Sequence, residues 1–240
     1  MAWSRQRREE VPRERLLVWG FGLGLARELY MFSHVSWGFI TGGGDPGNAA
    51  LHLAEPLEHA LTMAAVVMVA GAFIRYIMDD ARIARRYIQV GLSIATVAFA
   101  STWFWWYQIA LADPEARFNR TGAGLISHLL VAVFAAAAIV LLSKRKGWLR
   151  NVVTVALGFF VVSGVLRLTN YVTGHEQAYI ICPICNSLHI IAIPILGYVY
   201  IREQSIEKQQ AEEALEAYRN HLEDLVEERT TELTNANEQL

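Results

Sequence analysis

Four histidines lie inside apolar stretches of the chain and could together bind a prosthetic group or a metal ion. They are His34, His59, His128 and His189. At a rise of 1.5 Å per residue, each lies about 9–12 Å along its helix from the same predicted membrane face. An ionisable side chain inside a bilayer is costly and usually serves a function. The shared depth therefore predicts one common site in the outer half of the membrane.

Other potential metal ligands accompany these histidines at helical spacing. Two sets of three residues each follow steps of three and four positions, which places each set on one face of a helix. Imidazole and thiolate ligands suit copper or zinc, whereas carboxylates beside histidine also suit iron. The candidate metal ligands are Cys182, Cys185 and His189 in one set, and His52, Glu55 and His59 in the other.

A b-type haem is the second chemistry that this set of residues predicts. It needs one or two axial imidazoles, an apolar pocket and cations for its propionates. Arg167 is the predicted propionate partner, and the aromatic residues 103–107 could wall the pocket. The sequence leaves three alternatives open: haem b, a bare copper, zinc or iron ion, and histidines that only form hydrogen bonds between helices.

The apolar stretches are long enough to cross a bilayer, which takes about 20 residues. Of the 240 residues, 54% are hydrophobic and only 18% are charged. We therefore predict an all-α membrane protein, a bundle of six transmembrane helices. They cover residues 16–41, 51–77, 87–111, 122–143, 151–173 and 182–202. The first is the least apolar, because it contains Arg27 and Glu28.

Basic residues gather at one end of the predicted bundle, in the arm 1–15 and in the loops 75–86 and 144–150. By the positive-inside rule this end is cytoplasmic. Both termini are then cytoplasmic, and the histidines lie under the outer face of a bacterial inner membrane. Cys182 and Cys185 also fall at that outer face, where a disulfide can form. The net charge of −2 gives no reason to expect nucleic acid binding.

The composition changes sharply at about residue 203, where a polar stretch without glycine or proline begins. This stretch predicts one long helix, continuous with the sixth span. Its apolar seam repeats at steps of four and three residues, with one extra step that locally unwinds a coiled coil. The seam positions are Ala211, Leu215, Tyr218, Leu222, Leu225, Arg229, Leu233, Ala236 and Leu240. Because a single helix of this kind is marginal in water, we predict a parallel homodimer.

Residues 215–240 resemble the signalling-helix linker of bacterial sensor histidine kinases, most clearly in LEDLVEERTTEL at 222–233. The resemblance covers about the last tenth of the chain. It implies that kinase domains follow residue 240 and act on a response regulator. The chain has no ATP-binding motif and no phosphoacceptor histidine in a suitable context. We therefore expect it to be the non-catalytic sensor part.

Three parts are thus predicted: a basic arm at 1–15, a membrane sensor at 16–202 and a dimeric signalling linker at 203–240. The sensor is expected to bind haem or a transition metal and to report redox, gas or metal status through the coiled coil. One alternative is a b-type cytochrome or quinone-reactive electron-transfer protein. Such carriers usually place histidines at both membrane faces. Another alternative is a cofactor-free sensor of a small molecule.

Overall fold

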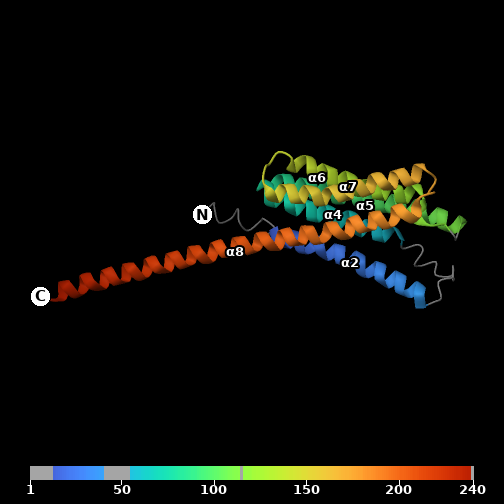
Figure 1. The fold of residues 1–240 in the computed structure, drawn as a ribbon. Helices are drawn as coiled ribbons and strands as arrows, with labels where there is room; N and C mark the ends of the chain where they lie inside the picture. The colour runs from blue at the N-terminus through green and yellow to red at the C-terminus, as the bar shows by residue number, and fades with distance from the viewer. Residues whose placement is uncertain (1–12, 41–54, 114–115, 239–240) are drawn as a thin grey trace. The chain divides into compact units, whose positions relative to one another are not determined.

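The computed structural model describes residues 13–40, 55–113 and 116–238 of the chain. Within them the secondary structure is helical, without a β-strand (Figure 1). The elements are α2 (Arg13–Ile40), α4 (Glu55–Met78), α5 (Ala81–Ala112), the short 3-10 helix η1 (Phe118–Arg120), α6 (Gly122–Leu142), α7 (Trp148–Val172) and α8 (Ala178–Glu238).

Five of these helices are long and apolar enough to cross a membrane, namely α4 to α8. The predicted all-α membrane protein is confirmed to that extent. The helix α2 covers the first predicted span but is not among the five, because the charges of Arg27 and Glu28 interrupt its apolar sequence.

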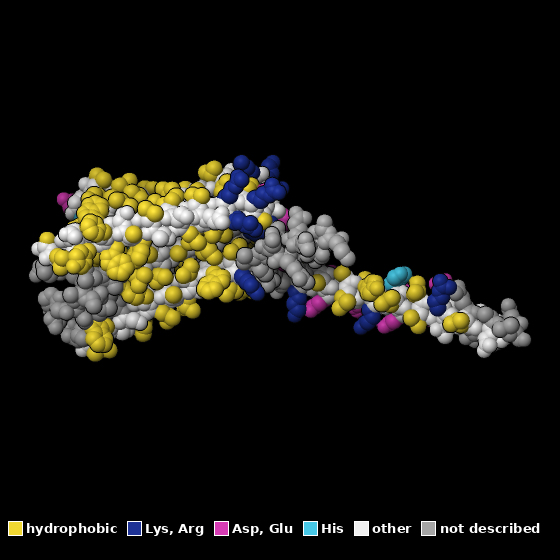
Figure 2. Space-filling model, turned by 180° about the vertical axis from the view of Figure 1, so that it is seen from behind, with side chains coloured by type: hydrophobic (Ala, Val, Ile, Leu, Met, Phe, Trp, Pro, Cys, Tyr) yellow, Lys and Arg dark blue, Asp and Glu magenta, His cyan; other side chains and the backbone are white. Residues whose placement is uncertain are grey.

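The helix α4 lies at the centre of the bundle and packs against α2, α5, α6 and α7. Its sequence is apolar on nearly every side, as expected for a helix surrounded by others. Met63, Val67 and Ile74 are fully buried along its length. The outer helices instead turn large apolar side chains outward, such as Val97 on α5 and Val133 on α6. Figure 2 shows this apolar outer surface, which suits contact with lipid chains.

Lysine and arginine side chains gather at one end of this bundle (Figure 2). The sequence places basic residues here at the end of α4, at the start of α5 and in the α6–α7 connection. The Arg145 guanidinium of that connection donates to the Met78 carbonyl of α4 at 3.1 Å. At the same end Asp80 caps α5 and accepts from the backbone N–H of Arg82 and Ile83 at 2.8 and 3.1 Å. These bonds, from Ile83 first and Arg82 second, lower the pKa of the Asp80 carboxyl.

The helices α6 and α7 approach closely where Gly164 faces Ala132. A Cβ atom added to Gly164 would lie 2.4 Å from the Ala132 Cβ, closer than two carbons can come. Small residues at such crossings let helix backbones pack tightly inside a membrane. Gly158, also on α7, has open space around it instead.

We expect Gly164→Ala to destabilise the bundle, because α6 and α7 must separate to admit the methyl group. Overpacking of this kind typically costs about 1–3 kcal/mol. Thermal or denaturant unfolding in detergent measures the effect, with Gly158→Ala as the matched control. Equal unfolding midpoints for Gly164→Ala and Gly158→Ala would show that the contact between α6 and α7 tolerates the added methyl group.

The chain divides into two compact units, residues 1–195 and 196–240, and the single helix α8 runs from one into the other. The predicted boundary at 203 lies seven residues later. In the second unit the side chains of Leu215, Tyr218 and Leu225 are exposed along the predicted seam. The long helix is confirmed, while its pairing with a second copy stays a prediction.

Candidate functional site

Two of the predicted histidines contact each other at the end of the bundle opposite the basic loops. His59 lies near the start of α4 and His128 near the start of α6, and because these two helices run parallel, both histidines lie at the same level. Their ring centroids are 4.6 Å apart, and the ring planes meet at 84°. His59 is buried, whereas His128 is half-buried.

The 3-10 helix η1 covers this histidine pair. Phe118 is completely buried, with its ring centroid 5.0 Å from that of His59 and 5.5 Å from that of Trp106. Next to it, the Asn119 side-chain oxygen accepts a hydrogen bond from His128 Nε2 at 3.2 Å. Of the aromatic run 103–107, Trp106 alone is buried; the other four side chains face outward.

Hydrogen bonds from α4, from the α7–α8 connection and at the start of α6 hold η1 in place. The Glu55 carboxylate of α4 accepts from the Phe118 N–H at 3.0 Å. Between α7 and α8, His175 Nε2 bonds the Arg120 carbonyl at 3.2 Å. Thr121 then begins α6 by accepting from the Gly124 N–H at 3.2 Å. Glu55, predicted as a metal ligand, therefore binds the backbone of η1.

Gly124 is required for this arrangement, because a Cβ atom there would lie 2.3 Å from the Phe118 carbonyl oxygen. That neighbour is backbone, so it cannot turn aside as a flexible side chain would.

We expect Gly124→Ala to displace η1 from the histidine pair and to weaken the bonds that hold Phe118 and Thr121. Hydrogen exchange of the amides at 118–121, followed by mass spectrometry, should then be faster than in the wild type. Gly158→Ala serves as the control. Unchanged exchange in Gly124→Ala would mean that η1 adapts without moving.

The first part of α8 meets α7 through three successive contacts, which we call the α7–α8 ladder. Arg167 Nη1 donates to Cys182 Sγ at 3.3 Å. The Cys185 thiol donates to the Ser163 carbonyl at 3.5 Å. The His189 ring stacks on Phe160, with centroids 4.8 Å apart.

The ladder is possible because the two helices run antiparallel with matching periodicity. Along α8, the ladder residues Cys182, Cys185 and His189 follow steps of three and four residues. Their partners on α7, which are Arg167, Ser163 and Phe160, follow steps of four and three residues in the opposite chain direction. The predicted stripe on α8 therefore faces α7. Arg167 also donates to the Asn186 side-chain oxygen at 3.2 Å. Both thiols are free of a disulfide.

Two polar atoms of this ladder are buried without a hydrogen-bond partner among the described residues: Arg167 Nε and His189 Nε2. Leaving a buried donor or acceptor unpaired costs about 1–3 kcal/mol. Arg167 is only 9% exposed, and its hydrogen bonds go to a cysteine sulfur and an asparagine amide rather than to a carboxylate. A polar ligand bound here would supply the missing hydrogen bonds.

This ladder and the histidine pair interact electrostatically. Arg27 of α2 pairs with Glu58 of α4 and, at 2.5 Å, with Glu28. His189 interacts electrostatically with Arg27, Arg167, Glu58 and His59. His128 similarly interacts with His59, Arg167 and His189. We call these six residues the polar cluster: Arg27, Glu58, His59, His128, Arg167 and His189.

The polar cluster thus contains three of the four predicted histidines and the predicted cation Arg167. The His34 side chain and the whole of His52 lie outside the described residues. Arg27 was visible in the sequence as an intramembrane charge, but its pairing with Glu58 depends on how α2 packs against α4. Phe118, Asn119 and Asn186 carried no distinctive sequence signal and were missed.

Within the described part of the chain, no three His, Cys, Asp or Glu side chains gather closely enough to hold a metal ion. Two of the described imidazoles that contact each other are those of His59 and His128. With metal–nitrogen bonds of about 2 Å, two imidazoles on one tetrahedral ion have centroids roughly 5 Å apart. The observed 4.6 Å is close to that separation.

Haem fits this histidine pair less well. Two imidazoles on opposite sides of a haem iron have centroids roughly 6 Å apart, with the macrocycle between them. His59 and His128 touch edge to face at 4.6 Å instead, so no macrocycle passes between them in this arrangement. No family model, curated protein or solved structure matches this chain.

Proposed function

We propose that the chain is the membrane sensor region of a bacterial sensor histidine kinase and that its polar cluster binds the stimulus. The observation that carries the proposal is the position of His189. It lies on α8, the helix that also contains the predicted signalling seam. A ligand that changes the contacts of Arg167 or His189 therefore acts directly on the helix that leads to the output.

The orientation forms part of the proposal. The basic end shown in Figure 2 would face the cytoplasm by the positive-inside rule. The polar cluster lies toward the other end, since His59 and His128 stand near the starts of α4 and α6. The site would then face the outer leaflet of the inner membrane, with α2 as a sixth span whose charges pair inside the bundle. An electron-carrying cytochrome is less well supported, because these histidines gather at one end only.

The ligand best suited to the cluster is an acidic small molecule with an apolar body. A buried guanidinium is stabilised by an anion, and the Arg167 contacts described above are neutral. The unpaired Nε of Arg167 offers a further donor, and His189 Nε2 lies in the same cluster. The positive charge of Arg167 also disfavours binding of a cation to the nearby histidines.

Decanoate tests this chemistry, and decanol is its uncharged counterpart. We expect decanoate, but not decanol, to raise the thermal midpoint of the purified protein in detergent. Arg167→Gln should weaken decanoate binding about 10- to 100-fold, the worth of a charge-assisted hydrogen bond. His221→Gln, in the exposed tail, should leave it unchanged. Equal responses to both compounds, or equal binding by both variants, would contradict the proposal.

A transition metal such as copper or zinc on His59 and His128 is the second candidate, supported by the separation of the two rings. In that case the purified protein should carry near-stoichiometric metal, measured by elemental analysis together with a visible spectrum. His59→Ala and His128→Ala should each lose it, while His221→Ala retains it. Metal-free wild type after incubation with copper or zinc would eliminate this candidate.

The homodimer is proposed from the exposed apolar seam of the second unit. Leu222 and Leu225 are each more than 40% exposed, and a partner helix would cover them. The i,i+4 pairs Lys208–Glu212 and Arg219–Glu223 support a single helix only weakly.

We expect Leu222→Glu combined with Leu225→Glu to turn a dimer into a monomer, measured as mass by light scattering in detergent. The control adds the same two charges away from the seam, as Ala217→Glu with Asn220→Glu, and should stay dimeric. A monomeric wild type, or a dimeric seam variant, would exclude the coiled coil as the dimer contact.

A further inference from the structure

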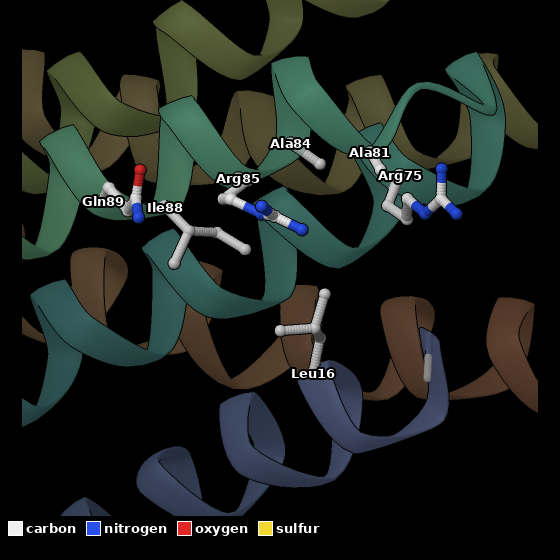
Figure 3. A pocket seen from close by; sticks show the side chains of 7 residues that line it. All are labelled: Leu16, Arg75, Ala81, Ala84, Arg85, Ile88 and Gln89. Atoms are coloured by element: carbon white, nitrogen blue, oxygen red, sulfur yellow. The ribbon is translucent and has the colours of Figure 1, made fainter. Parts of the chain in front are cut away.

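A pocket at the basic end of the bundle, remote from the polar cluster, opens between α2, the end of α4 and the start of α5 (Figure 3). Leu16 of α2 forms one wall. Arg75, in the last turn of α4, and Arg85, Ile88 and Gln89 of α5 form the others. Two alanines of the first turn of α5 complete the lining.

Both charged side chains that line this pocket are arginines, and its described lining contains no acidic residue. The nearby Asp80 caps α5 through two backbone hydrogen bonds, and its carboxylate also interacts electrostatically with Arg75. Arg85 is exposed, and Figure 3 shows its guanidinium lying between Ile88 and Arg75. The pocket therefore presents positive charge to an anion from outside.

The pocket is also where a lipid headgroup would lie. Arg75 stands at the end of the apolar helix α4, so the pocket lies at the level where the hydrocarbon region meets water. Leu16 and Ile88 give it an apolar side. Beyond them, Trp19 on α2 and Val90 on α5 are more than half exposed, so apolar surface continues along both helices.

We propose that this pocket binds the phosphate group of an anionic phospholipid, with the acyl chain along the outward faces of α2 and α5. Arg85 contacts the phosphate from α5, and Arg75 adds its charge from α4. Basic pockets between transmembrane helices on the cytoplasmic side bind such headgroups in this way. The lipid would then join α2, α4 and α5 at their basic end.

Native mass spectrometry with titrated lipid tests the proposal on the detergent-purified protein. Phosphatidylglycerol should bind, whereas phosphatidylcholine of the same chain length should bind much more weakly. Arg85→Gln should weaken phosphatidylglycerol binding about fivefold, the factor for one basic residue near an anionic headgroup. Arg86→Gln is the matched control, because Arg86 is the exposed neighbour that does not line the pocket.

Arg85→Lys keeps the charge and should restore most of the binding, which separates a lost contact from a folding defect. Equal losses in Arg85→Gln and Arg86→Gln would overturn the pocket in favour of diffuse surface charge. Equal binding of phosphatidylcholine would overturn the anionic requirement. If inorganic phosphate competes at low millimolar concentration and phosphatidylglycerol shows no advantage, the site binds free anions and not a lipid.

Discussion

The structure depends on one constraint: a charged or polar group placed among apolar helices must find its partner inside the bundle. Water and lipid offer no alternative at that depth. Arg27 meets this requirement by reaching across to Glu58, which fixes how α2 lies on α4. Arg167 meets it less completely, through Cys182 and Asn186. Helix packing at this end of the bundle therefore follows from the polar side chains as much as from the apolar ones.

The helices themselves were largely predictable from sequence, because long apolar runs leave few other possibilities. The start of α8 was predicted four residues too late, although residues 178–181 are themselves apolar and helical. The predicted first span was the exception, and Arg27 and Glu28 are the cause. Whether such charges interrupt a span or pair within it depends on a neighbouring helix, which hydropathy does not consider.

The candidate site was predictable only in part. Depth and periodicity brought His59, His128, His189 and Arg167 to one end, because both follow directly from helical geometry. They did not reveal η1, since a short connection carries no periodic signal. Phe118 acts through contacts with His59 and Glu55, which are far away in sequence, and Glu55 binds there as a hydrogen-bond acceptor. Asn119 contacts His128, nine residues later in the chain.

The α7–α8 ladder has a consequence for how α8 can move. Its three contacts share one register, so a small slide of α8 along α7 strains all of them together. Such a slide would also leave the Arg167 guanidinium buried without its partners. The three contacts together therefore hold α8 in one register on α7.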